Sequence, residues 1–186
     1  VAEESSKGFD ISIKEYIEDS SVNIWMVSKD PYVNSYYRAG EIINVPKGHE
    51  GKAINIAYKA HEKQRDHSGI PYILHPIHLA EQMTTEDTCV VAILHDVVED
   101  TTVTLEDLRQ EGFSEAQLEG IRLLTHLPDV DYFDYVRGLK DNPIARAVKI
   151  ADLHHNSDPS RLVEITPHDL ERFEKYKKAL EILGAK

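Results

Sequence analysis

The stretch that decides the fold reads Thr88-Cys-Val-Val-Ala-Ile-Leu-His-Asp-Val-Val-Glu-Asp-Thr101. Its apolar run contains no proline or glycine, which predicts a buried helix over residues 86–99. His95 and Glu99 are four residues apart, as are Asp96 and Asp100, so each pair would stack one turn apart on such a helix. Four polar groups at the end of an apolar helix are costly to bury unless they bind something, and a divalent metal ion would satisfy them.

The composition is that of an ordinary globular protein. The chain has 186 residues, enough for one domain with a proper core and a small appendage. It carries 21 basic and 33 acidic residues, a net charge of −12, which argues against a nucleic-acid partner because phosphate contacts need a basic face. A phosphorylated small-molecule substrate would therefore need a metal ion or a local basic patch to offset the overall field.

The cysteine count and the hydropathy argue against disulfide-bonded, zinc-cluster and membrane-spanning proteins. The single cysteine, Cys89, allows neither an internal disulfide nor a thiolate zinc cluster, and it reads as a small core residue. No stretch reaches the length of a transmembrane span, and the N-terminus lacks the pattern of a signal peptide. We therefore expect a cytoplasmic protein with no membrane partner, while the oligomeric state stays open.

The chain divides into an appendage, residues 1–47, and a main domain, residues 48–186. The segment Val22-Asn-Ile-Trp-Met-Val27 and the alternation at Ile11-Ser-Ile-Lys14 predict short strands in the appendage, and a helix over residues 10–19 is the alternative. Pro46-Lys-Gly48 marks the boundary.

The main domain is predicted to be all-α, a helical bundle. Thr104 and Ser114, each followed three residues later by Asp or Gln, are capping-box signatures for two of its helices. Gly184 is expected to end the last helix. The helices are predicted over residues 53–63, 77–83 and 86–99, from Thr104, from Ser114 to near His126, and over 132–140, 143–155 and 167–183.

Four positions form a candidate metal site, and they are His75, His95, Asp96 and Asp152. Imidazoles and carboxylates without thiolate suit manganese or iron, or zinc with open positions. Adjacent His and Asp side chains diverge by about 100° on a regular helix, so the spacing alone does not establish that both bind one ion. In the alternative interpretation, Glu99 and Asp100 are the solvated end of a helix.

Five segments in this order resemble the HD-domain phosphohydrolases. Within this group, residues 50–183 resemble the hydrolase domain of the stringent-response alarmone enzymes and their small stand-alone relatives. The segments are Ala60-His-Glu-Lys-Gln64, Gly69-Ile-Pro-Tyr-Ile-Leu-His-Pro76, Ala92-Ile-Leu-His-Asp-Val-Val-Glu-Asp-Thr101, Thr104-Leu-Glu-Asp-Leu108 and Val148-Lys-Ile-Ala-Asp152 with Asn156.

The resemblance implies a helical fold, one manganese ion, and removal of the 3′-pyrophosphate from guanosine tetraphosphate or pentaphosphate. The metal ligands that it implies are His75, His95, Asp96 and Asp152. It also implies that Glu99 and Asp100 activate or orient the attacking water and that Asn156 contacts the substrate.

One departure from the family bears on the substrate. The alarmone hydrolases usually carry an Arg-Lys pair where this chain has Asp66 and His67, and Arg65 stands one place early. Arg65 and His67 remain candidate substrate-binding residues. An aspartate in place of a cation repels phosphate, so we expect weaker recognition of guanosine tetraphosphate than in a typical alarmone hydrolase.

The sequence thus predicts a metal-dependent phosphohydrolase acting on a nucleotide or another small phosphoester, with an alarmone as the first candidate. A metal-dependent nucleotide sensor without turnover is the alternative, and Glu99 with Asp100 argue against it because a sensor does not need to activate water. A purely structural helical module would bind no metal at all.

Overall fold

The computed structural model describes residues 23–25, 42–44, 49–66, 69–162 and 164–185. Contacts between Cα atoms divide the chain into two compact units, residues 1–55 and 56–186. The helix expected as an alternative over residues 10–19 and the alternating segment at Ile11 lie outside the described residues.

The first unit contains two short strands, β1 (Asn23–Trp25) and β2 (Ile42–Asn44). They pair antiparallel, with Asn23 opposite Asn44 and Trp25 opposite Ile42. β1 lies within the segment 22–27 for which a strand was predicted. Helix α2 (His49–Ala60) begins in this unit and ends in the second.

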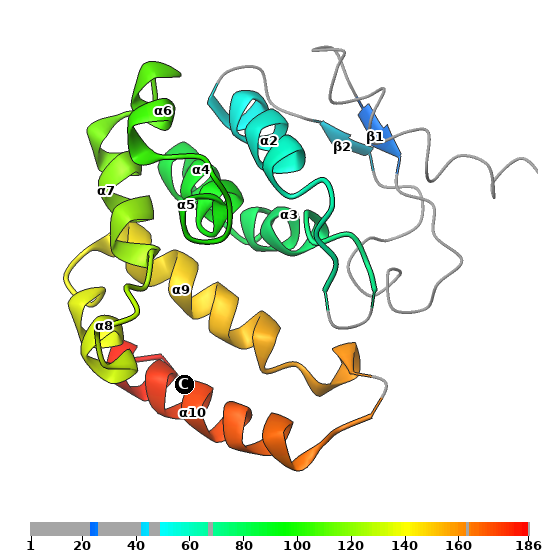
Figure 1. Cartoon of the computed structure of the whole chain (residues 1–186), viewed down its shortest axis with the longest axis vertical. Helices are drawn as coiled ribbons and strands as arrows, with labels where there is room; N and C mark the ends of the chain where they lie inside the picture. The colour runs from blue at the N-terminus through cyan, green and yellow to red at the C-terminus, as the bar shows by residue number, and fades with distance from the viewer. Residues whose placement is uncertain (1–22, 26–41, 45–48, 67–68, 163, 186) are drawn as a thin grey trace, which may run out of the picture. The chain divides into compact units, whose positions relative to one another are not determined.

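The second unit is helical throughout its described part (Figure 1). This agrees with the predicted all-α fold class. Its elements in chain order are α3 (Leu74–Ala80), α4 (Glu86–Leu94), α5 (Val97–Asp100), α6 (Leu105–Gln110), α7 (Glu115–Leu124), α8 (Tyr132–Gly138), α9 (Pro143–Asn156), the 3₁₀ turn η2 (Pro159–Arg161) and α10 (Pro167–Leu183).

Helix α4 forms the centre of the hydrophobic core. Its residues from Val90 to Leu94 are all buried, and the helix packs against α3, α7 and α9. A helix that is apolar on every face must be surrounded by others, which is why the run quoted from the sequence decides the fold. Each fully buried Val, Ile or Leu contributes about 1.5–3 kcal/mol through removal of apolar surface from water.

Polar caps set where the helices begin. Thr104 and Ser114 make the two predicted capping boxes, each accepting a hydrogen bond from a backbone amide three residues on. Thr85 and Thr166 make two more, before α4 and α10. Gly184 ends α10 with a φ of 73°, a left-handed conformation that glycine adopts without steric cost.

The prediction of one continuous helix over residues 86–99 is wrong. Helix α4 ends at Leu94 and α5 begins at Val97, and Asp96 between them has φ −99° and ψ −5°. Val97 is buried like the residues of α4, so the apolar pattern continues through the break and gives no sign of it. The break places His95 and Asp96 outside regular helix, where the expected divergence of adjacent side chains does not apply.

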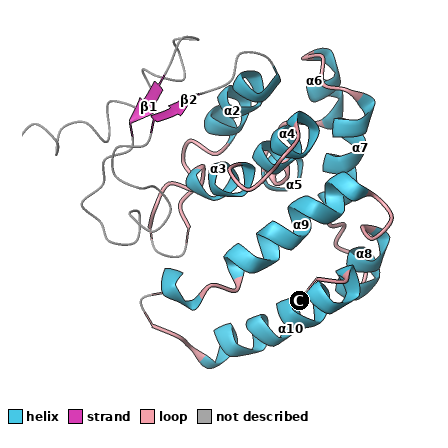
Figure 2. Cartoon of the chain, turned by 180° about the vertical axis from the view of Figure 1, so that it is seen from behind, coloured by secondary structure: helices cyan, strands magenta, loops and turns pink. Residues whose placement is uncertain are grey.

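Helix α9 connects the core to the C-terminal part of the chain. It packs against α3, α4, α7 and α10, and α10 also packs against α8 (Figure 2). Its long span brings side chains of α9 next to those of α3 and the end of α4. Among the described residues, no helix combines the length and apolar content needed to cross a membrane.

Candidate metal centre

The four predicted metal ligands come from three places in the second unit. His75 lies on α3, His95 and Asp96 lie at the break after α4, and Asp152 lies on α9. Ligand atoms of His75, His95 and Asp96 lie within 4.8 Å of one another. Asp152 joins this cluster through its Oδ1, which lies 3.3 Å from His75 Nε2. The structure therefore brings three of the predicted ligands into one group and places the fourth, Asp152, against His75, although the four are spread over 78 positions of the sequence.

His95 has one ring nitrogen committed to the backbone and one directed into the cluster. Its Nδ1 lies 2.8 Å from the carbonyl oxygen of Ala92, and this oxygen can only accept, so Nδ1 carries the hydrogen. Its Nε2 is buried, lies 2.8 Å from Asp96 Oδ2, and makes no well-directed hydrogen bond within the described part of the chain. A buried nitrogen beside a carboxylate fits a bound cation, so the residues present suit a divalent ion.

The charges of the cluster set its protonation. Burial alone would lower the pKa of His95, but the Asp96 carboxylate outweighs it and raises that pKa to about 9. Burial opposes ionisation of Asp96, yet His95 holds the pKa of Asp96 well below its usual range. The pKa of His75 is lowered, because burial outweighs its contact with Asp152. At neutral pH and without metal, His95 is therefore protonated and positively charged, whereas His75 is neutral.

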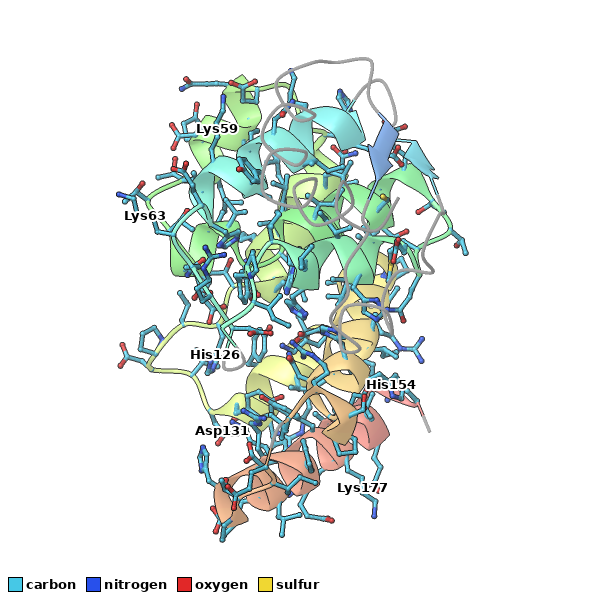
Figure 3. The ribbon with its side chains drawn as sticks, turned by 90° about the vertical axis from the view of Figure 1, so that its right-hand side faces the viewer. Lys59, Lys63, His126, Asp131, His154 and Lys177 are labelled. Carbon is cyan, nitrogen blue, oxygen red and sulfur yellow. The ribbon has the colours of Figure 1, made fainter. Side chains whose placement is uncertain are left out.

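His155 fixes the orientation of His75. The two Nδ1 atoms lie 2.6 Å apart, and the two rings stack with centroids 4.8 Å apart. Burial, followed by the influence of His75, lowers the pKa of His155 to about 2, so His155 stays neutral. If His75 presents Nε2 to an ion, its Nδ1–H donates to His155, an arrangement common for histidines that bind metals. His154, the next residue before it, is exposed on α9 (Figure 3).

Asp152 is held by two side chains of its own helix. Lys149 Nζ donates to its Oδ2 at 2.8 Å, and Asn156 Nδ2 donates to its Oδ1 at 2.5 Å. Burial disfavours both charges, yet the Lys149 cation keeps the pKa of Asp152 well below its usual value. In return, Asp152 raises the pKa of Lys149 well above its usual value. Asp152 is therefore ionised and limited in the directions from which it can bind an ion.

Tyr72 adds a further contact to the cluster. Its hydroxyl donates to Asp96 Oδ2, and its ring lies 5.6 Å from that of His75 and 4.9 Å from that of His61. Burial, and then the Asp96 charge, raise the pKa of Tyr72, so its hydroxyl keeps the proton that it donates.

The two predicted water-activating carboxylates lie on α5, directly after Asp96. Both residues are exposed, yet partial desolvation raises the pKa of each carboxyl group. Glu99 Oε2 accepts a hydrogen bond of 2.8 Å from the backbone amide of His126. Asp100 feels the charge of Asp96 most strongly, followed by those of His61 and His95. The charge of Asp96 raises the pKa of both carboxyl groups, so both residues lie within the electrostatic influence of the cluster.

A pocket of about 340 Å³ adjoins the cluster, and His75 and Tyr72 form part of its wall. Two of the three predicted substrate-binding residues, Arg65 and Asn156, also line it, while His67 lies outside the described residues. The pocket is also lined by Leu162, Asp158, Arg161, Arg172 and Tyr176, for which, as for Tyr72, the sequence motifs indicate no role. The segments 156–162 and 171–176 carry arginines in the sequence, but only the fold shows that Arg161 and Arg172 line the same pocket as His75.

Comparison with known proteins identifies the family. The model of the HD domain matches residues 53–152, and the chain belongs to this family. The bifunctional (p)ppGpp synthase/hydrolase SpoT of Escherichia coli K12 is 35% identical over 119 residues, which are 56% of this chain and 17% of that protein. The guanosine-3′,5′-bis(diphosphate) 3′-pyrophosphohydrolase of Vibrio cholerae is 45% identical over 78 residues, 39% of this chain and 11% of that protein.

The chain thus spans less than a fifth of the length of these curated relatives. A solved structure, described as a metazoan ortholog of SpoT that hydrolyzes ppGpp and plays a role in starvation responses, aligns with a TM-score of 0.60. It is 24% identical, and the alignment covers 74% of this chain and 86% of the solved one. At that identity the likeness shows a common fold.

Proposed function

We propose that this chain is a metal-dependent phosphohydrolase that removes the 3′-pyrophosphate from guanosine tetraphosphate or a closely related nucleotide. The observation that carries the proposal is the cluster of His75, His95 and Asp96, with Asp152 against His75, beside a pocket with three arginines. A pocket with that lining suits a phosphorylated substrate despite the net charge of −12. The relatives, a (p)ppGpp synthase/hydrolase and a guanosine-3′,5′-bis(diphosphate) 3′-pyrophosphohydrolase, suggest the nucleotide.

The four clustered side chains would hold one divalent ion, and manganese is the first choice because the donors are imidazole and carboxylate. Such an ion supplies Lewis acidity toward a phosphoryl oxygen and makes water a stronger acid. Asp100 would take the proton of the attacking water, since partial desolvation brings its pKa upward, toward that of a useful base. Glu99, fixed by the amide of His126, would orient the water.

Other chain groups would bind and orient the substrate. Asn156 reaches both Asp152 and the pocket, so it can hold a phosphoryl oxygen beside the cluster. Arg65 lines the same pocket from the loop that precedes α3.

We also propose that residues 48–186 carry the activity and residues 1–47 form an appendage. Because of the likeness to stringent-response enzymes, we also propose that the chain acts in the stringent response and in the cytoplasm.

The test is a hydrolysis panel of guanosine tetraphosphate, GTP and GDP with manganese. We expect pyrophosphate release from the tetraphosphate, and loss of that release in D96N and D152N. D134N is the matched control, because Asp134 forms an exposed pair with Arg137, and its turnover should stay at the wild-type level. Nucleotide binding without turnover of any substrate would refute the proposed hydrolase activity and favour the alternative, a metal-dependent nucleotide sensor.

A further inference from the structure

Arg161 lies on η2 and lines the pocket beside the candidate metal centre. Its Nη1 donates to the carbonyl oxygen of His155 at 3.1 Å and to Asn156 Oδ1 at 3.2 Å. Both acceptors belong to the last turn of α9, the end of a helix at which a cation is favourable. The guanidinium is therefore held in one place, and only about 17% of the side chain is exposed.

Asp66 meets Arg161 in the same pocket. Its Oδ2 lies 3.5 Å from Arg161 Nη2, and its Oδ1 accepts a hydrogen bond of 3.0 Å from the backbone amide of Ile70. The ion pair is longer than the roughly 2.7–2.9 Å of a well-formed charge-assisted hydrogen bond. A phosphate oxygen that approaches Nη2 can take the place of Asp66 while both Nη1 bonds to α9 remain.

Asn156 connects Arg161 to the metal cluster. Its Nδ2 donates to Asp152 and its Oδ1 accepts from Arg161, so a single amide fixes the position of the arginine relative to the ligands. A substrate with one phosphoryl group at the cluster would place its other phosphates in the pocket, where the guanidinium lies.

We infer that Arg161 binds a phosphate of the substrate other than the one that reacts, and that Asp66 is its counter-ion until substrate displaces it. This inference rests on the proposed function and names a specificity-determining residue for it. It changes the interpretation of Asp66: the carboxylate that replaces a family cation does not leave the pocket without a phosphate-binding group, because Arg161 contributes one from η2. Asp66 then competes with the substrate and weakens its binding without abolishing it.

The test uses the full chain loaded with manganese and titrates GDP and guanosine by calorimetry. R161Q should weaken GDP binding by about tenfold to a hundredfold, the usual range for loss of a charge-assisted hydrogen bond, and leave guanosine unchanged. D66N should strengthen GDP binding by about threefold to tenfold, and most of that gain should vanish in the R161Q background. R122Q removes an exposed arginine paired with Glu119 and should change neither affinity.

Two further measurements separate the possible failures. R161K keeps the charge but loses the planar fork, so it should bind GDP with an intermediate affinity, and thermal unfolding checks that each variant folds. The inference would be overturned if R161Q bound GDP within twofold of wild type, or if D66N strengthened GDP binding equally in the R161Q background. Either result would count against it even if the wild type hydrolyses guanosine tetraphosphate. The predicted affinity pattern without any hydrolysis would support Arg161 as the phosphate-binding residue and count against the proposed function alone.

Discussion

Manganese binding should release one proton, and that proton should come from His95. The Asp96 carboxylate raises the pKa of His95 to about 9, so at pH 7 roughly 99% of the metal-free protein carries the proton. An ion and a proton compete for the same Nε2. The other three ligands contribute no proton, because the pKa values of His75, Asp96 and Asp152 are all lowered.

The direction and the size of the pH dependence of metal affinity follow from this competition. Because the metal-free form binds more protons than the loaded form, metal affinity should rise with pH up to about 9. One released proton gives about a tenfold increase in affinity per pH unit well below pH 9 and less near it, so the gain is about fiftyfold between pH 7 and 9, equivalent to about 2.3 kcal/mol.

Calorimetry in buffers of different ionisation enthalpy measures the proton release directly, at pH 6.5 to 8.5. H168Q is the control, because His168 is exposed in the first turn of α10, and it should release the same proton as wild type. An affinity that does not change over this pH range would refute the reasoning, because His95 would then already be neutral in the metal-free protein.

Three further perturbations test other parts of the site and the core. E99Q and D100N should keep the metal but slow hydrolysis by on the order of 10²–10⁴, with the larger loss in D100N; unchanged turnover in both would mean that the pair is only a solvated helix end. H155A should weaken manganese binding by about tenfold to a hundredfold, and H155N, which keeps a polar atom at the δ position, should restore part of it; equal affinities for H155A and wild type would exclude the positioning role. L94A should lower the free energy of unfolding by about 2–5 kcal/mol in urea titrations, since Leu94 is fully buried in the core, and a loss below 1 kcal/mol would contradict that packing.

Local signals explain why much of the fold was predictable from the sequence. The apolar run before His95 required a central helix, and Thr104 and Ser114 marked two helix starts through contacts only three residues long. The break between α4 and α5 was not predictable in this way, because Val97 continues the apolar pattern. The break nevertheless matters for the site, since it lets the neighbouring side chains of His95 and Asp96 approach to 2.8 Å.

The site was predictable where motifs name its residues and not where only the fold assembles it. His75 and Asp152 could be proposed as partners from their motifs, but their distance of 3.3 Å depends on how α3 packs against α9. The role of His155 depends on the same packing. Arg161 became visible only when η2 placed it beside Asp66, 95 positions earlier in the chain. Long-range contacts of this kind leave no periodic trace in a sequence.

The most direct test of the central claim is a titration of manganese into the chelator-treated full chain, with pyrophosphate release from guanosine tetraphosphate followed at each addition. The account predicts that turnover rises linearly and saturates at about one equivalent, as a single site requires, and that H95Q gives no turnover at that loading. Turnover in the chelated protein, turnover of H95Q equal to wild type, or no hydrolysis at any loading would contradict it.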